Sequence, residues 1–442
     1  MSLRAGASEA IITPPVGVDL SGYADRPGPA EAIHDDLHCR ALLLDDGRAR
    51  LALLALDLLG VDFPLDRAIR DAVAEAGGLP TQHVLVNCSH THAGPATSRL
   101  VGMGSADEAY LATLPARAAE AVARALAQLA PVRLSYAEGP AKAGINRRQR
   151  RPDGIYLGPN PEGLCDDRVR VLRVEAEGAA DPLAVVFQHA CHGTTLGGAN
   201  RQITAEWMGV ACRSLAARLG ATPLFLQGCC GEINPEAREH SFSELTRIGE
   251  EMAAAVLRAL DSAQPLPGVP LAARLETIEL PLQDPPTPDV AQAHVARAEQ
   301  QLAAAQREGA HPYWVQALQG LLHHARRIAA LSESGAADLR LPFAVQAMRI
   351  GDLGLVALSG EVFFELAQAV VRSSPFPHTF VLGCSNGCTG YVPTAEAFDE
   401  GGYEVDLSFR YYGTLPLAPH AGDQMVAAAS AMLRGLWEET GR

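Results

Sequence analysis

The stretch Ser89-His90-Thr91-His92-Ala93-Gly94-Pro95 places two histidines one residue apart, after the apolar run Val84-Leu85-Val86. Apolar runs rich in β-branched residues that end near Gly or Pro are typical of buried strands. In a strand, this spacing would put both imidazoles on one face. Imidazole is a common zinc ligand and the side chain best suited to proton transfer near neutral pH. Alone, the pair fits a metal site or polar loop residues without a function.

The composition is that of a globular protein, with 442 residues of which 48% are hydrophobic and 20% charged. This length accommodates one large domain or two ordinary ones. The net charge of −15 argues against nucleic acid or an anionic membrane as a main partner, although a local arginine could still bind a small anionic substrate. The chain contains no 18-residue apolar run, so we expect no integral membrane segment.

The amino-terminal residues and the cysteines bear on location. The start, Met1-Ser2-Leu3-Arg4-Ala5-Gly6, lacks the apolar core of a secretory signal, and the nine cysteines form an odd set without ordered spacing. We interpret them as reduced thiols and expect a cytoplasmic protein from a bacterium. The sequence contains no paired C-x-x-C motifs, so a metal would be held mostly by other side chains.

Apolar runs alternate with amphipathic segments, which predicts an α/β fold with mixed sheets and flanking helices. Between 288 and 331 strand signals disappear, which predicts a helical hairpin at about 284–335. Its Tyr313 and Trp314 would either line a substrate entrance or pack within the hairpin. Residues 143–152 are expected to be a basic, turn-forming loop. Strands are expected at 10–23 (interrupted by prolines), 38–44, 50–56, 132–137, 168–175, 183–188, 223–227, 270–282, 343–350, 353–358 and 379–382, and helices at 65–76, 107–129, 205–219, 243–261, 362–371 and 420–437.

Polar residues follow many of these strands. In α/β proteins, sites gather beyond the carboxyl ends of strands. Two imidazoles from separate strands and one carboxylate would make a plausible catalytic zinc set with an open position for water. Some of these polar residues also have a structural explanation. Glu361 would be a carboxylate at a helix amino terminus, His189 a core histidine and Asp57 a helix cap. The polar residues at strand ends are Asp57, His90, His92, His192, Asn234, Glu361 and Tyr391.

These motifs resemble the catalytic domain of the neutral/alkaline, non-lysosomal ceramidase family, over nearly all of residues 8–437. The family's His-Thr-His-Ser-Gly-Pro motif corresponds to the stretch from His90 to Pro95. Its second zinc histidine corresponds to His192. Its Gly-Glu-Phe-Thr motif corresponds to Gly360-Glu361-Val362-Phe363, and its Tyr-Val/Ile-Thr-Thr-x-Glu-Glu-Tyr segment begins at Tyr391. The resemblance therefore implies zinc held by His90, His192, Glu361 and Tyr391.

Three further residues carry roles that the resemblance implies. His92 would lie beside the metal on the substrate side, Arg147 would face the substrate, and Tyr403 would hydrogen-bond the reacting carbonyl. In such a site zinc lowers the pKa of bound water towards about 7 and polarises the carbonyl. Arg, Tyr and His donors can then stabilise the developing oxyanion.

One position departs from the family. The family's Gly-Asp-Val-Ser-Pro, whose serine is assigned as a nucleophile or essential hydroxyl, is Gly231-Glu232-Ile233-Asn234-Pro235 here. Asn234 cannot be a nucleophile, although its amide can orient a substrate or water. We therefore predict a zinc-dependent hydrolase that cleaves an amide or ester bond of a small or lipid-like substrate with metal-activated water, and ceramide is not the expected substrate. The alternatives are a zinc-dependent lyase or isomerase, or a non-catalytic ligand-binding member of the family.

The expected organisation is one ceramidase-like catalytic domain over residues 1–442. The hairpin at about 284–335 would be specific to this chain, and the family's C-terminal immunoglobulin-like domain is expected to be absent. The expected partner is a small-molecule substrate, and the sequence carries no signal for the oligomeric state.

Overall fold

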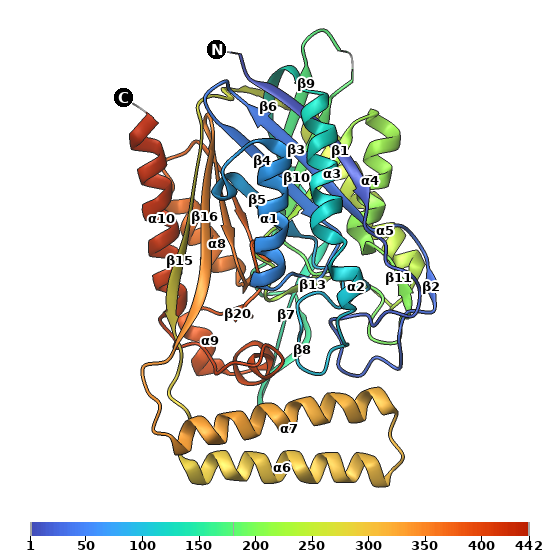
Figure 1. Ribbon diagram of the computed structural model, residues 1–442, viewed down its shortest axis with the longest axis vertical. Coiled ribbons are helices and arrows are strands. Elements are labelled where there is room, and N and C mark those ends of the chain that lie inside the picture. The colour runs from blue at the N-terminus through green and yellow to red at the C-terminus, as the bar shows by residue number, and fades with distance from the viewer. Residues whose placement is uncertain (1, 180, 441–442) are drawn as a thin grey trace.

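The computed structural model describes residues 2–179 and 181–440, and two large mixed β-sheets flanked by helices form its body (Figure 1). This confirms the expected α/β class. In spatial order the larger sheet contains β12 (Thr222–Gln227), β10 (Ala184–His189), β9 (Arg168–Ala176), β6 (Ala130–Pro140), β1 (Arg4–Ile11), β3 (His38–Asp45), β4 (Arg50–Leu56) and β5 (Val84–Cys88), with β14 (Gln264–Leu266) paired to β6. The second sheet contains β15 (Leu271–Pro281), β16 (Arg340–Ile350), β17 (Leu353–Leu358) and β19 (His378–Leu382).

Alternate residues of the central strands enter different apolar layers. In β4, Leu51 and Leu53 face a layer shared by the two sheets, whereas Ala52 and Leu54 face a layer shared with helices. Successive side chains of a strand point to opposite faces, so an unbroken apolar run can be buried on both. All four side chains are fully buried, and the strand lies where the sequence predicts one.

Helices cover the outer faces of both sheets. Buried side chains of α1 and α3 share an apolar layer with β1, β3 and β4, and those of α4 and α5 share one with β9, β10 and β12. On the second sheet, α8 and α10 have the same role (Figure 1). The bounds are α1 (Phe63–Gly77), α2 (Glu108–Leu111), α3 (Leu114–Ala127), α4 (Glu206–Leu219), α5 (Phe242–Leu260), α6 (Pro288–Arg307), α7 (Pro312–Glu333), α8 (Phe364–Ser373), α9 (Ala395–Glu400) and α10 (Ala421–Thr440).

Three elements differ from the sequence-based prediction. The helix expected over 107–129 is divided into α2 and α3, because Pro115 lies in the first turn of α3 and cannot continue the preceding hydrogen-bond ladder. The first strand is β1, which ends at Ile11, so the strand expected over 10–23 is wrong. Residues 144–151 form a strand and not the expected loop. The smaller pairings involve β7 (Gly144–Arg151) between β8 (Gly154–Asn160) and β13 (Ile233–Pro235), β18 (Glu361–Val362) with β20 (Tyr391–Val392), and β2 (Ala32–Ile33) with β11 (Gln202–Ile203).

Between β15 and β16 the chain forms α6 and α7, which pack against each other. The pair lies beside the end of the body that carries β7, β8 and β20 (Figure 1). It occupies the region where the sequence predicts a helical hairpin. Among the described residues, a search for helices with the length and hydropathy of a membrane span finds none.

Candidate metal centre

Parallel strand pairs place the candidate residues at one end of the sheets. β4 pairs with β5, β10 with β12, β17 with β19 and β18 with β20, each pair in parallel. The carboxyl ends of parallel strands lie at the same edge, where loops converge. His90 and His92 follow β5, His192 follows β10, Asn234 lies in β13, and Glu361 and Tyr391 lie in β18 and β20.

Two buried amides tie these strand ends together. The side chain of Asn87 accepts a hydrogen bond from the backbone nitrogen of Gln227 at 2.7 Å. The amide nitrogen of Gln227 donates to the carbonyls of Ser89 and Cys191 at 2.9 and 2.8 Å. Because these two residues immediately precede His90 and His192, Gln227 fixes both histidine loops from one side chain.

The chain leaves the strand before the two neighbouring histidines. β5 ends at Cys88, and His90 has a φ of 64°, in the left-handed region that non-glycine residues rarely adopt. The alternation expected from a continuing strand therefore does not apply. The turn nevertheless brings the Nε2 atoms of His90 and His92 to 3.3 Å from each other.

Each of the three histidines points its Nδ1 at a backbone carbonyl. A carbonyl can only accept, so Nδ1 carries a hydrogen, and Nε2 is the nitrogen left to bind a metal ion or a second proton. Such bonds fix the tautomer and ring orientation of metal-ligating histidines. The pairs are His90 with Leu59 at 2.8 Å, His92 with Gly22 at 3.2 Å, and His192 with Cys230 at 2.8 Å.

Glu361 faces two of these Nε2 atoms. Its Oε2 lies 3.2 Å from Nε2 of His90 and 3.0 Å from Nε2 of His192. Tetrahedral ligands at zinc–nitrogen distances of about 2.0–2.1 Å are separated by about 3.3 Å, so the spacing suits a single ion. His90, His92 and His192 form a group that could hold a metal, and the carboxylate adds negative charge beside it.

The charges in the cluster shift the pKa values of its members. Burial lowers the pKa of His90, but the Glu361 carboxylate outweighs burial and raises it to about 9. Burial and the two neighbouring imidazoles hold the pKa of His92 well below its usual range. Burial raises the pKa of Glu361, yet His90 and His192 bring it well below the ordinary value. The site therefore contains an ionised carboxylate and a neutral His92 at neutral pH.

Arg147 connects the remaining candidates. The register between β7 and β8 shifts beside it, as at a β-bulge, which re-aims a side chain. Its Nε donates to Glu404 at 2.8 Å and its Nη2 to the hydroxyl of Tyr391 at 2.9 Å. Its Nη1 lies 3.1 Å from Oδ1 of Asn234 and 3.2 Å from Nε2 of His192. The guanidinium thus faces the metal cluster from the side of Asn234.

Tyr403 lies in the same cluster. It begins a one-turn π-helix, Tyr403–Leu407, and its ring centroid is 5.9 Å from that of Tyr391. The Cζ atom of Arg147 lies 5.8 Å from the Tyr403 ring. The structure therefore brings together Asn234 and all the residues to which the family resemblance gives a role.

Two other polar residues at strand ends lie outside the cluster. His189 points Nδ1 at the carbonyl of Arg168 at 2.9 Å and is fully buried, as expected for a core histidine. Asp57 neither caps a helix nor joins the site: it accepts hydrogen bonds from Arg40 and from the backbone of His38, both at 2.9 Å. Both residues complete the packing around the strand ends.

Sequence reasoning missed several neighbours of the cluster. Tyr412 donates a hydrogen bond to Oε1 of Glu361, and the Tyr23 ring lies edge-on to His92 with centroids 5.2 Å apart. Glu404 forms ion pairs with both Arg147 and Arg148. These residues lie in loops or turns that follow no apolar strand, so no signal marked them, whereas Asn87 and Gln227 carried the signal of a polar residue at a strand end.

Comparisons with known proteins identify the family of this chain. The sequence profile described as "Neutral/alkaline non-lysosomal ceramidase, N-terminal" matches residues 4–222. The chain belongs to the neutral/alkaline ceramidase family. Membership of this ceramidase family implies a hydrolase that acts on an amide bond. A comparison with curated proteins gives no match.

Two solved structures show that the ceramidase fold extends over almost the whole chain. The structure of the neutral ceramidase from Pseudomonas aeruginosa aligns with a TM-score of 0.75 at 19% identity, covering 99% of this chain and 75% of that one. A structure titled "Ceramidase complexed with C2" aligns with a TM-score of 0.77 at 20% identity, covering 99% and 76%. At these identities the alignments establish the ceramidase fold.

Proposed function

We propose that this protein is a zinc-dependent hydrolase that cleaves an amide bond, or an ester bond of similar geometry, in a small substrate by attack of water. The observation that carries the proposal is the convergence of three imidazole Nε2 atoms and the Glu361 carboxylate on one point. Zinc suits this set, because it prefers nitrogen and carboxylate ligands.

His90, His192 and Glu361 would hold the ion, with Tyr391 as the fourth residue. Burial raises the pKa of Tyr391, and Arg147, which donates to its hydroxyl, opposes this effect and favours the phenolate that a ligand must be. When bound, zinc would supply Lewis acidity and lower the pKa of a coordinated water. Tyr412 would orient Glu361 through its hydrogen bond to Oε1.

His92 and Arg147 would have different duties. His92 is neutral with an unprotonated Nε2, because its Nδ1 donates to Gly22. It can therefore accept a proton from the attacking water and return it to the leaving amine. Arg147, Tyr403 and the Asn234 amide would hold the carbonyl and its developing negative charge.

Asn234 replaces a hydroxyl with an amide, so no acyl-enzyme forms at this position, and water is the attacking group. Hydrolysis in water enriched in ¹⁸O should place one labelled oxygen in the carboxylate product. Turnover that yields a product without ¹⁸O would contradict hydrolysis and indicate a lyase or isomerase. Turnover should also require about one zinc per chain, as for other catalytic zinc sites, and zinc analysis of chelator-free protein checks that requirement.

We also propose that residues 1–442 act as one catalytic unit of which the α6–α7 pair is an insertion. The pair is anchored to the body near the site: His324 lies 2.8 Å from the carbonyl of Thr414, and Arg327 donates to that of Gly413 at 2.8 Å. A cytoplasmic location stays our expectation, and all nine cysteines are free thiols.

A further inference from the structure

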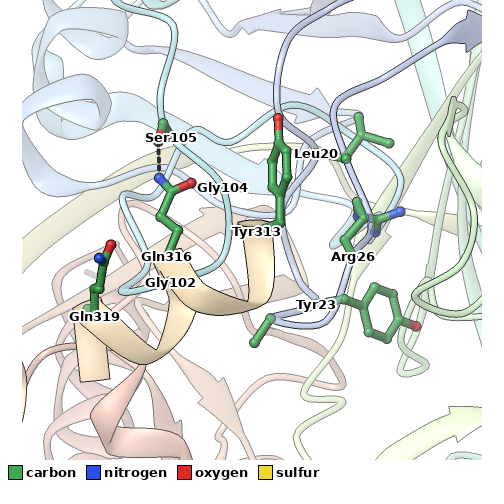
Figure 2. Close-up of a pocket in the computed structure, with 12 residues that line it drawn as sticks. Leu20, Tyr23, Arg26, Gly102, Gly104, Ser105, Tyr313, Gln316 and Gln319 are labelled. Carbon is green, nitrogen blue, oxygen red and sulfur yellow. Dashed lines mark hydrogen bonds between the residues drawn. The ribbon is translucent and has the colours of Figure 1, made fainter. Parts of the chain in front are cut away.

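A cavity of about 380 Å³ lies between the N-terminal loop and the first turns of α7 (Figure 2). This volume is in the range of about 300–1,000 Å³ that is usual for small-molecule sites. Tyr23 and Arg26 form one wall, and Tyr313, Gln316 and Gln319 of α7 form the other. Trp314, the other aromatic residue considered for a substrate entrance, is not among the lining residues.

The α7 wall is fixed to the body. Tyr313 donates to Asp19 at 2.9 Å. Gln316 donates to Ser105 at 3.1 Å (Figure 2). Gly102 has a φ of 72°, and a Cβ at this position would lie 2.8 Å from Cα of Ala317, so only glycine allows so close a contact. The cavity is therefore a formed feature of the fold.

Arg26 is the one cation among the residues that line this cavity, and it is buried, with 3% of its surface exposed. Its guanidinium donates to the backbone carbonyls of Asn200, Ser21 and His92. Among the described residues it forms no ion pair with a carboxylate, and its buried Nε has no hydrogen-bond partner. Burial lowers its pKa to about 10, although Tyr23 and Asp25 raise it.

A buried guanidinium without a counter-ion is unfavourable, and a carboxylate ligand would remove this cost. Asp19, the acidic residue at the rim, already accepts hydrogen bonds from Tyr313 and from the backbone of Ser105. The remaining polar groups of the cavity are neutral amides and hydroxyls, and Leu20 is its one large aliphatic residue. Such a lining suits a short polar ligand and gives little surface for long hydrocarbon chains.

The cavity adjoins the candidate metal centre through His92. Arg26 donates to the His92 carbonyl at 2.6 Å, and the Tyr23 ring lies edge-on to the His92 imidazole. A Cβ on Gly22 would lie 2.3 Å from Nδ1 of His92, so the loop that carries Tyr23 and Arg26 is in direct contact with this histidine. The loop that forms one wall of the cavity is thus in contact with the histidine proposed to move the proton.

We infer that the cavity binds the carboxylate of the substrate through Arg26, and that the substrates are short amides bearing a carboxylate, such as N-acyl amino acids. This inference rests on the proposed amide hydrolysis for its reaction and adds the class of substrate. The α6–α7 pair would then act as a specificity wall that closes the cavity around the polar end of the substrate.

The test compares N-acetyl amino acids with the N-acetyl amino alcohols of the same side chains. These pairs share the scissile amide and differ only in the carboxylate. For the zinc-loaded protein we expect the carboxylate member to be favoured by about 10- to 100-fold in kcat/KM, measured by acetate release, as is typical of a charge-assisted hydrogen bond. Calorimetry should show the same preference in Kd, independently of turnover.

Three variants locate the carboxylate site. Arg26→Gln should abolish the preference mainly through KM and Kd. Gln319→Glu adds a negative charge to the cavity wall at an exposed position and should reduce the preference several-fold. Gln301→Glu on α6, also exposed but not a lining residue, is the matched control and should leave the preference unchanged. If Arg26→Gln fails to fold, Gln319→Glu still tests whether the cavity binds the carboxylate.

The outcomes separate this inference from the proposed function. Acetate release without preference, or a preference that Gln319→Glu leaves intact, would overturn the carboxylate site and leave the hydrolase standing. A preference in Kd that is lost in His90→Ala but kept in Arg26→Gln would place the carboxylate on the metal, and would also overturn it. Carboxylate-selective binding sensitive to Gln319→Glu, without any acetate release, would support the cavity and contradict the hydrolase.

Discussion

His90 and His92 differ in what surrounds each imidazole. The His90 Nε2 faces Glu361 directly, whereas the His92 imidazole lies against Tyr23 of the N-terminal loop. A metal needs the charge of the carboxylate beside its ligands, and a proton acceptor needs a neutral lone pair open to the substrate. The surroundings therefore suit His90 for the metal and His92 for proton transfer.

This division predicts different metal contents for single variants. His90→Ala, His192→Ala and Glu361→Ala should each bind far less than the one zinc per chain expected of the native protein, because each loses a ligand. His92→Ala should keep its zinc but lose activity by about 100-fold or more, as is common for a general base. Elemental analysis after dialysis, paired with turnover, checks both. Zinc loss in His92→Ala would instead make all three histidines ligands.

Asn234 gives a second prediction at this scale. Its Oδ1 accepts from Arg147 at 3.1 Å, so Asn234→Ala removes a partner that orients the guanidinium. We expect kcat/KM to fall roughly 10-fold, the effect of one lost hydrogen bond to a charged group, with zinc content and unfolding temperature unchanged. Wild-type turnover in this variant would show that Asn234 has no role in the reaction.

Among the elements, those with strong local patterns were predictable from the sequence. Apolar runs such as 50–56 and 223–227 predicted strands that the structure contains, and polar residues after several such runs lie together in the candidate site. The basic run 144–151 was misread because Glu404, which neutralises Arg148, lies 256 residues away. Tyr412 and Tyr23 were missed for the same reason: tertiary folding alone brings them to Glu361 and His92.

The hydrogen bonds from Gln227 to the two histidine loops predict that fold stability and metal binding are coupled. Gln227→Leu leaves the carbonyls of Ser89 and Cys191 buried without their donor, at a cost of about 1–3 kcal/mol for each unsatisfied group. We expect a lower unfolding temperature of the metal-free protein and weaker zinc binding, since both histidine loops lose their anchor. Gln301→Leu, at an exposed position on α6, is the control. Zinc affinity equal to that of the control would contradict the anchoring role.

On the scale of the whole molecule, Glu232 links the segment at β13 to α8, the helix that covers the second sheet. It immediately precedes β13, and its carboxylate accepts from the backbone nitrogen of Phe364, the first residue of α8, at 2.9 and 3.1 Å. Its backbone carbonyl accepts from Arg147 at 2.8 Å. α8 has no side-chain cap of its own, so a residue 132 positions earlier in the chain caps the helix that covers the second sheet.

Burial raises the pKa of Glu232 from 4.5 to about 8, against the lowering effect of the backbone N–H groups. The unfolded chain releases this proton near its ordinary pKa, whereas the folded protein keeps it until about pH 8. The contribution of Glu232 to stability is therefore complete below about pH 4.5 and declines as the pH rises towards 8, by at most about 1.4 kcal/mol per pH unit.

Glu232→Gln keeps the shape and a hydrogen-bond acceptor but cannot ionise. Relative to this variant, the unfolding temperature of the native protein should fall steadily between pH 5 and pH 8, because only the native residue can ionise at this position. Thermal melts of both proteins across this range, loaded with the same zinc, isolate the difference from all other titrating groups. If the unfolding temperatures of the two proteins change with pH in parallel, Glu232 is already ionised in the folded protein and is stabilised by the amino terminus of α8.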